Sequence, residues 1–291
     1  MSAATVPAGV RARPRVRRSN RPRALTLVAA VVALAFIAPA VWILVGSFRP
    51  GNEIFESLSP LSWHVLFPNS VTLDNYTGLF GNGFGGALLN SVIVCGASVI
   101  GGLAMSALAA YPLAVLRFPG RSLIFAVIVV SFLVPFEAIA IPLSQLFSDW
   151  HLTDTYIGLI LPGLGNGLAI FNLRQAFRGI PSSLREAAVI DGASEWRILT
   201  RIYLPLSGSA LINCSLLIFL GQWTAYLWPL LVTSRSDMQV APIALAKTFS
   251  EHSFDFGQNF AGAVLLSVVP AALIFLLQRF FTRSIANTGV K

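Results

Sequence analysis

The chain has 291 residues and a formal net charge of +8; 55% of its residues are hydrophobic and only 11% are charged. A soluble domain carries roughly 25% charged residues and a disordered chain is poor in apolar ones, so this composition excludes both classes. It predicts an all-α integral membrane protein.

Six apolar stretches approach the length of about 20 residues that a helix needs to cross the hydrocarbon of a bilayer. The fourth stretch is the least regular, because Pro162 and several glycines interrupt it. The first follows a basic segment, as a signal peptide does, but it is too long and no small-residue cleavage site follows it, so we interpret it as a retained helix. The six predicted spans are residues 24–47, 87–116, 123–147, 156–173, 206–232 and 260–278.

The basic residues predict the orientation of these spans. Seven arginines lie between Arg11 and Arg23, next to the first span. If this tail is cytoplasmic and the loops alternate, only Arg49, Arg235 and Lys247 fall on the outer side. This asymmetry follows the positive-inside rule and predicts that both termini are cytoplasmic. Membrane topology therefore explains the basic tail better than nucleic-acid binding does, and we expect membrane lipid and no nucleic acid as a partner.

The spans and charges together predict a division of the chain. It consists of an Arg-rich cytoplasmic tail (1–23), a first transmembrane helix (24–47), an extracytoplasmic loop (48–86), a permease core (87–281) that contains a long cytoplasmic loop (174–205), and a cytoplasmic C-terminal tail (282–291).

The sequence offers little chemistry of its own. Cys95 and Cys214 lie inside apolar stretches and are interpreted as buried small side chains, and the three histidines have no metal-ligand spacing. No phosphate-binding G-x-x-x-x-G-K-[ST] loop and no catalytic constellation are present. We therefore predict no enzyme activity, no metal and no cofactor in this chain, and expect any ATP to be hydrolysed by another subunit.

Small residues recur every four positions in the second span, at Ser98, Gly102, Ser106 and Ala110. Such a face lets helix backbones approach closely in lipid. We interpret it as internal packing, with a dedicated subunit interface as the alternative.

The loop between residues 174 and 205 has a regular pattern. Ser183 and Glu186 fit a capping box at the start of a short helix, and Gly192 is expected to end that helix. Ser194 is expected to cap a second helix, from Glu195 to Tyr203. The first helix is slim enough to enter a groove on a partner or, alternatively, to rest on lipid, and its spacing alone leaves both alternatives open.

The same loop resembles the EAA motif of permeases from binding-protein-dependent ATP-binding-cassette (ABC) importers. The matching positions are Glu186, Ala187, Ala188, Gly192, Ile202, Leu204 and Pro205. The resemblance implies a type I importer permease in which a coupling helix docks on a cytoplasmic ATPase dimer that binds ATP and Mg. It also implies a second permease subunit and an extracytoplasmic solute-binding protein.

Further stretches are similar to the carbohydrate, MalG-like members of that family. Asn90-Ser91 opens the second span, Tyr111 lies near its end, and Pro135-Phe136-Glu137 lies in the third. One departure is Trp223-Thr224, where members often have Trp-Asn. The resemblance extends over nearly the whole chain beyond the arginine tail.

We expect the coupling contact to use Glu186, Ala187, Ala188, Asp191 and Gly192. The Glu186 carboxylate is expected to contact the ATPase and also to cap its helix, whereas Gly192 is expected to adopt a positive φ. For Asp191, two alternatives stay open, a pair with Arg185 or Arg197 and a solvated charge.

Four residues are candidates for the solute path: Glu137, Gln222, Trp223 and Tyr226. Glu137 is the only acidic residue within a span, and it either lines the path or accepts bonds from backbone groups near the outer surface. Gln222 and Tyr226 continue a face that begins at Ser215 and Phe219, and Trp223 is adjacent to it, a combination of polar and aromatic groups that suits sugars. Ordinary helix packing is the alternative for that face.

We therefore interpret the chain as a permease subunit that imports a sugar or oligosaccharide through a bacterial inner membrane by alternating access. One alternative is an ABC permease for glycerol phosphate or another small solute. A second is an ion-coupled secondary transporter, which usually needs several ionisable groups within its spans.

Overall fold

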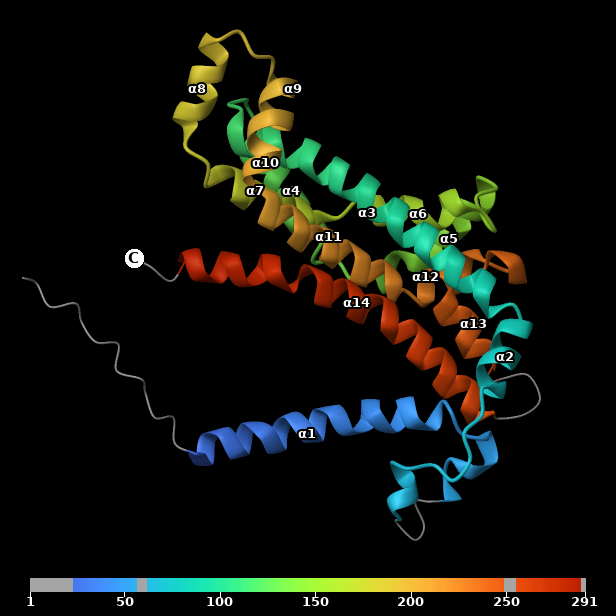
Figure 1. Ribbon diagram of the computed structural model, residues 1–291. Coiled ribbons are helices and arrows are strands. Elements are labelled where there is room, and N and C mark those ends of the chain that lie inside the picture. The colour runs from blue at the N-terminus through green and yellow to red at the C-terminus, as the bar shows by residue number, and fades with distance from the viewer. Residues whose placement is uncertain (1–22, 57–61, 249–254, 289–291) are drawn as a thin grey trace, which may run out of the picture. The chain divides into compact units, whose positions relative to one another are not determined.

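The computed structural model describes residues 23–56, 62–248 and 255–288, and every regular element within these ranges is helical (Figure 1). The chain divides into two compact units, residues 1–42 and 43–291. The first helix, α1 (Arg23–Gly46), supplies the described part of the first unit and extends into the second. Its bounds agree with the first predicted span, 24–47.

The second unit contains the other helices of the described ranges. Its longer helices are α2 (Asp74–Gly81), α3 (Phe84–Val115), α4 (Arg121–Ser131), α5 (Phe136–Asp149), α6 (Tyr156–Leu164), α7 (Gly167–Arg178), α8 (Ser182–Ile190), α11 (Gly208–Trp223), α13 (Ala241–Thr248) and α14 (Phe256–Thr288). The shorter ones are η1 (Gly51–Glu53), η3 (Trp63–Val65), α9 (Glu195–Ile198), η4 (Leu199–Tyr203), α10 (Leu204–Leu206), α12 (Leu227–Val232) and η5 (Ser236–Met238).

Helix α3 is the central element of the second unit and contacts α6, α7, α11 and α13. All four members of its small-residue face are buried. A Cβ added to Gly102 would lie 3.3 Å from the carbonyl oxygen of Gly163 and 3.4 Å from Cδ1 of Ile218, so a larger residue has little room there. The interpretation of this face as internal packing is confirmed.

Three of the predicted spans are not single straight helices. Within the described ranges, Leu25–Gly46, Phe84–Val115 and Phe256–Gln278 are long and apolar enough to cross a membrane alone. Three further pairs of helices reach that length only when each bent pair is counted as one span, which gives up to six spans. The all-helical membrane architecture is confirmed, and the predicted count of six corresponds to this upper figure.

The predicted third span, residues 123–147, is wrong as a continuous helix. Helices α4 and α5 meet at an angle of 94°, and Pro135 immediately precedes α5. Proline lacks a backbone N–H and disfavours a helical conformation in the residue before it, so α4 cannot continue through this point. The irregular fourth span is also broken, by 44°, and the side chain of Asn166 caps α7 by accepting a bond from the Ala169 N–H at 2.8 Å.

The predicted fifth span, residues 206–232, is also interrupted. Helix α11 ends at Trp223, and the chain becomes helical again at α12, where Pro229 lies in the first turn. The first turn tolerates proline because its N–H groups have no partner within the helix, whereas a continuous helix would place the ring against the carbonyl of Ala225. The break before α12 therefore places Pro229 where its missing N–H costs no intrahelical hydrogen bond.

The polar residues that open the second span connect it to a distant segment. The Asn90 amide donates to the carbonyl oxygens of Asp237 at 2.8 Å and Gln239 at 2.9 Å, and its oxygen accepts from the Tyr156 hydroxyl at 2.7 Å. The Ser91 hydroxyl accepts from the N–H of Ala241 at 2.8 Å. This end of α3 is thus fixed by satisfied, largely buried hydrogen bonds.

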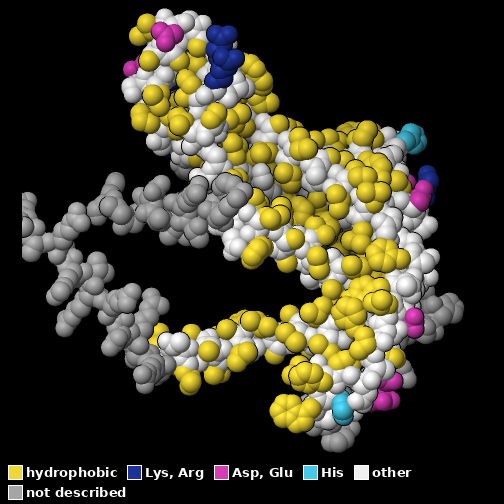
Figure 2. Space-filling model, viewed as in Figure 1, with side chains coloured by type: hydrophobic (Ala, Val, Ile, Leu, Met, Phe, Trp, Pro, Cys, Tyr) yellow, Lys and Arg dark blue, Asp and Glu magenta, His cyan; other side chains and the backbone are white. Residues whose placement is uncertain are grey.

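The surface of the second unit matches a membrane environment. Figure 2 shows hydrophobic side chains over most of the visible face, with charged side chains gathered towards its two ends. Helix α4 has no buried residue, and Leu123, Val127 and Val130 are each more than 60% exposed. Lipid can cover such helices, because all their backbone groups are paired internally. Cys95 and Cys214 are both buried and unpaired, as predicted.

Candidate functional site

The coupling loop, residues 174–205, lies at the end of α3 opposite the Asn90 contacts, where Figure 1 shows α8 and α9 side by side. Helix α8 begins at Ser182, two residues earlier than the capping-box pattern predicts, and Pro181 occupies its cap position without a side-chain bond. The predicted capping box is therefore wrong. Ser183 lies inside the first turn and Glu186 lies beyond the position from which it would reach the cap.

The turn after α8 is confirmed. Asp191 ends the helix and Gly192 adopts a φ of +74°, the left-handed region that favours glycine. The N–H of Ala193 donates to the carbonyl of Ala188 at 2.9 Å and closes the turn. The Ser194 hydroxyl then caps α9 by accepting from the N–H of Arg197 at 3.4 Å, as predicted.

The helical segment after this turn is longer than predicted. It runs from Glu195 through the π-helical turn η4 to Leu206 and meets α11 at 84°. The predicted end at Tyr203 is wrong because Pro205 is accommodated inside the segment. Proline has no backbone N–H to donate to the preceding turn. The π-helical turn just before Pro205 changes the hydrogen-bond pattern, so that this N–H is not required.

A three-residue link joins the coupling loop to α3. The Tyr111 hydroxyl, near the end of α3, donates to Oε2 of Glu195 at 2.5 Å. The Arg185 guanidinium, on α8, donates to both oxygens of the same carboxylate and forms an ion pair with it. Glu195 thus accepts charge-assisted hydrogen bonds from two different elements, an arrangement that is stronger and more directional than a neutral pair.

The Arg185 pair also sets the charge states of the link. Its hydrogen bond is the main reason that the pKa of Glu195 lies below the usual range, and the same contact raises the pKa of Arg185. A lowered carboxyl pKa means that the pair is intact at neutral pH and is lost only as pH falls through that lowered value. The link therefore operates as a charged pair under physiological conditions.

Aromatic packing surrounds the link. The Tyr111 ring makes edge-to-face contacts with Tyr203 at 5.2 Å and with Phe177 at 6.4 Å, and the last two rings pack at 5.7 Å between centroids. All three side chains are buried. Such pairs add to the free energy of burial and hold their rings in defined orientations. The coupling loop is thus packed firmly against the ends of α3 and α7.

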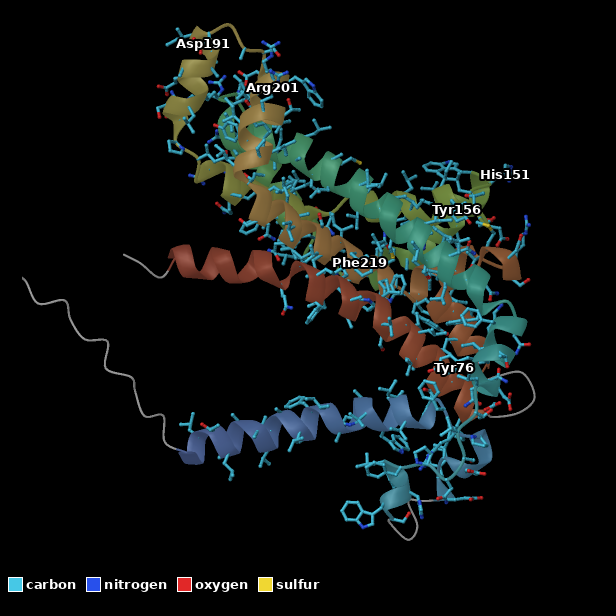
Figure 3. All side chains as sticks on the ribbon, viewed as in Figure 1. Tyr76, His151, Tyr156, Asp191, Arg201 and Phe219 are labelled. Atoms are coloured by element: carbon cyan, nitrogen blue, oxygen red, sulfur yellow. The ribbon has the colours of Figure 1, made fainter. Side chains whose placement is uncertain are left out.

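Sequence reasoning did not identify this link. It offered Arg185 only as one possible partner of Asp191, whereas the structure pairs Arg185 with Glu195. Asp191 is exposed at the turn between α8 and α9, where Figure 3 labels it. The one signal in the sequence was an acidic residue directly after the Ser194 cap, a position that many helices occupy with Asp or Glu for their dipole alone.

The EAA residues present two different faces. Glu186 and Ala187 are exposed, whereas Ala188 packs against the buried core beside Tyr203 and Phe177. The exposed side of α8 also carries large apolar side chains, since Leu184 is 44% exposed and Ile190 is 86% exposed. An exposed apolar helix face with one carboxylate is suited to a groove on a partner protein.

The candidates for the solute path do not form one cluster of free polar groups. The Gln222 amide donates to the Ser98 hydroxyl on α3 at 3.1 Å, and the Trp223 indole donates to the carbonyl of Leu266 on α14 at 2.9 Å. Trp223 is buried and stacks with Phe219 at 5.4 Å. These contacts position α11 against its neighbours.

The other two candidates lie outside α11. Tyr226 is 46% exposed in the break before α12, and Glu137 is exposed in the first turn of α5. Among the described residues, no three His, Cys, Asp or Glu side chains are grouped as a metal site would require. The assignment of a solute path to these four residues stays a prediction.

The helical architecture and the coupling loop define a membrane permease of the importer class. The profile of the family described as "Binding-protein-dependent transport system inner membrane component" matches residues 102–287, more than half of the chain. The chain belongs to this family, and it is a multi-pass membrane protein. This assignment favours the importer interpretation over an ion-coupled secondary transporter.

Relatives cover almost the whole chain. It is 33% identical over 274 residues to the arabinooligosaccharides transport system permease protein AraQ of Halalkalibacterium halodurans, covering 92% of this chain and 95% of the relative. It is 33% identical over 284 residues to the sn-glycerol-3-phosphate transport system permease protein UgpE of Agrobacterium fabrum, covering 92% and 98%.

A solved structure has the same fold. It is a chain of a bacterial ABC transporter involved in the import of the acidic polysaccharide alginate, with a TM-score of 0.77. The similarity covers 92% of this chain and 100% of that one at 23% identity, so it shows the fold alone.

Proposed function

We propose that this chain is the transmembrane permease subunit of an ABC importer for a sugar or an oligosaccharide. The family membership and the names of its relatives support this function. In the assembly we expect a second permease, a cytoplasmic ATPase dimer and an extracytoplasmic solute-binding protein. ATP and Mg belong to the ATPase, and this chain supplies the path and the conformational change.

The observation that carries the proposal is the link from the coupling loop to α3. An exposed α8 offers a docking face, and Arg185 and Glu195 connect that face to Tyr111. Helix α3 has 32 residues, so it extends about 48 Å and reaches the Asn90 contacts near its far end. A displacement at α8 is therefore carried to the opposite side of the membrane by one continuous helix.

This connection explains alternating access as a rigid-body process. Closure of the ATPase on nucleotide moves α8, and the link makes α3 follow with the α6, α7 and α11 helices that pack on it. Coupling of this kind is reciprocal, so a loaded binding protein that favours the outward-open state also favours ATPase closure. The chain itself forms the path and transmits the conformational change, and it needs no catalytic group for this role.

The names of the relatives indicate two candidate classes of solute. Similar identities connect this chain to permeases named for arabinooligosaccharides and for sn-glycerol-3-phosphate. We favour a sugar because the sequence is similar to the carbohydrate, MalG-like permeases and to an arabinooligosaccharide permease, and a polyol phosphate is the second candidate. Calorimetric titration of the cognate binding protein with both classes will distinguish them.

The function is tested by reconstitution. The purified chain alone is expected to hydrolyse no ATP. Assembled with its second permease and ATPase in proteoliposomes, it is expected to show hydrolysis that the loaded binding protein stimulates, together with solute uptake. Uptake that proceeds without ATPase subunits would contradict the proposal and favour a secondary transporter.

The proposed orientation has its own test. Reporter fusions after Phe55 and after Asp255 are expected to be extracytoplasmic, and a fusion after Arg185 cytoplasmic, because the positive-inside rule places the coupling loop inside. An extracytoplasmic signal at Arg185 would contradict both the orientation and the coupling role of the loop.

The docking face of α8 is tested by cross-linking. Ala187 is exposed, so Ala187→Cys is expected to leave the fold intact and to cross-link to a cysteine in the cleft of the ATPase, with a yield that changes with nucleotide. Arg201→Cys, also exposed but on η4, is the matched control. Equal cross-linking yields at both positions would show that α8 does not contact the ATPase more closely than η4 does.

Glu186 is expected to contribute charge to this contact. Because the structure gives it no capping bond, Glu186→Ala is expected to leave the stability of the chain unchanged and to lower uptake at least about tenfold, the loss of one charged interfacial contact. Thermal unfolding and uptake measured together distinguish this outcome from misfolding. A destabilised Glu186→Ala variant would argue for a structural role instead.

A further inference from the structure

A hollow of about 850 Å³ lies at the end of α3 opposite the coupling loop. It is bordered by the turn between α2 and α3, by η5, by α13 and by the start of α14. Figure 1 shows α2, α13 and the start of α14 beside the first turns of α3. Sites for small molecules occupy about 300–1,000 Å³, so the size of this hollow suits a small organic solute. We call it the outer hollow.

The packing beneath the outer hollow is apolar and fixed. Leu79 and Phe84 line it and belong to a buried cluster that also contains Ala241 and Ala261. The Asn90 hydrogen bonds described above hold the η5 side in place through two backbone carbonyls. The hollow is therefore formed by the fold before any ligand enters it, as most small-molecule sites are.

Amide side chains from three different elements line the outer hollow. They are Asn82 after α2, Gln239 after η5 and Gln258 on α14. Asn82 and Gln258 share one long hydrogen bond of 3.4 Å, and the Ser236 side chain between these elements is exposed. An amide offers two donors and an acceptor, so this lining can exchange hydrogen bonds in both directions with a ligand.

Gln239 carries an unsatisfied donor at the wall of the outer hollow. Its side chain is 4% exposed, and within the described ranges its Nε2 has no hydrogen-bond partner. Buried amides are nearly always paired, because a buried donor without an acceptor is destabilising. Since Gln239 lines the hollow, a ligand oxygen there can serve as the acceptor.

The charges around the outer hollow indicate a neutral ligand. The lining contains two carboxylates, Asp237 and Asp255, and one ammonium group, Lys247. Asp237 is paired with Arg235, and Asp255 accepts from the N–H of Gly257 at 2.9 Å. No excess of positive charge is present to attract a phosphate, whereas neutral hydroxyl groups can donate to carboxylates and accept from amides.

We infer that the outer hollow binds a neutral sugar, whose hydroxyl groups pair with the amides and carboxylates of the lining. The inference rests on the proposed function for the class of solute, and it selects a sugar over a polyol phosphate. Under the proposed orientation the hollow opens on the extracytoplasmic side, where solute enters the permease. Gln239 would bind the part of the sugar that lies deepest.

The test is protection of an introduced cysteine in the detergent-solubilised importer, assembled without its binding protein. Ser236 is exposed and lines the hollow, so Ser236→Cys is expected to react with a maleimide, whereas the natural Cys95 and Cys214 are buried. Among millimolar arabinotriose, xylotriose and maltotriose, at least one is expected to slow this reaction about tenfold, and glycerol 3-phosphate is expected to have no effect. The matched control is Ser234→Cys, an exposed position outside the hollow, which is expected to react at the same rate with and without sugar.

Gln239→Met in the Ser236→Cys background tests the amide. Methionine has a similar size, and the donor that it removes has no partner among the described residues. Thermal stability and the labelling rate without sugar are therefore expected to be unchanged. The sugar concentration that gives half protection is expected to rise about tenfold, the effect of one buried hydrogen bond.

Several outcomes would overturn the inference. They are the absence of protection by all three sugars, equal protection of Ser234→Cys, and protection by glycerol 3-phosphate alone. Protection by sugar-free binding protein, with none from any sugar, would assign the hollow to docking. A Ser236→Cys variant that reacts in the isolated chain but not in the assembly would show that the second permease covers the hollow. Because labelling requires neither ATP nor transport, failure of this site is distinguishable from failure of the proposed function.

Discussion

Glu195→Ala is expected to abolish solute uptake while ATP hydrolysis by the assembled importer persists without stimulation by the binding protein. The substitution removes the acceptor that joins Tyr111 of α3 to Arg185 of α8. Hydrogen bonds to charged groups are worth about 1.5–3 kcal/mol each, and the partial exposure of this pair places the value near the lower limit. Both bonds share the Glu195 carboxylate, so its loss disconnects α8 from α3 at the link.

Tyr111→Phe provides the graded version of this experiment. It removes only the hydroxyl and leaves the Arg185–Glu195 pair and the aromatic packing in place, so uptake is expected to fall about tenfold, the effect of one such hydrogen bond. Tyr203→Phe is the matched control, because Tyr203 shares the buried aromatic packing but is not a hydrogen-bond partner of Glu195. Equal losses in both tyrosine variants would mean that packing, and not the link, carries the coupling.

The readout must separate coupling from assembly. Stimulation of hydrolysis by loaded binding protein reports on coupling, whereas the amount of ATPase subunit that co-purifies reports on docking. We expect Glu195→Ala to reduce the stimulation of hydrolysis and to leave the amount of co-purified ATPase within about twofold of wild type. The reason is that the exposed face of α8 does not contain Glu195. Loss of co-purification would show that Glu195 contributes to docking on the ATPase and not to the transmission of motion to α3.

Local features of the coupling loop could be predicted from the sequence because they depend on neighbouring residues. The positive φ of Gly192 and the Ser194 cap both follow from side chains within three positions. The capping box failed for a related reason. The helix begins at Ser182 with Pro181 at the cap position, and the Ser183–Glu186 spacing alone does not determine where a helix begins.

The link could not be predicted because it joins residues that are distant in the sequence. Tyr111 and Glu195 are 84 positions apart, and neither has an unusual sequence context. The same limit applies to the solute path, where helical spacing placed Gln222 on one face with Trp223 adjacent to it. Only the positions of α3 and α14 show that these side chains already have partners.

Gly192→Pro is expected to abolish uptake. Proline is confined to a φ near −65°, whereas the backbone at this position has a φ of +74°, so the turn between α8 and α9 cannot form. An added Cβ at Gly192 meets nothing within 4 Å, so the penalty arises from the backbone and not from a clash. The angle of α8 would change, and with it the alignment of the docking face and the Arg185–Glu195 pair.

A series at this position isolates the conformational requirement. Alanine in the left-handed region costs about 1–2 kcal/mol, so Gly192→Ala is expected to lower uptake by roughly tenfold, whereas Gly192→Asn, which tolerates this region, is expected to remain close to wild type. The matched control is Gly208→Ala, where an added Cβ also has open space but φ lies outside the left-handed region. An asparagine variant as defective as the proline variant would exclude backbone conformation as the reason for glycine at position 192.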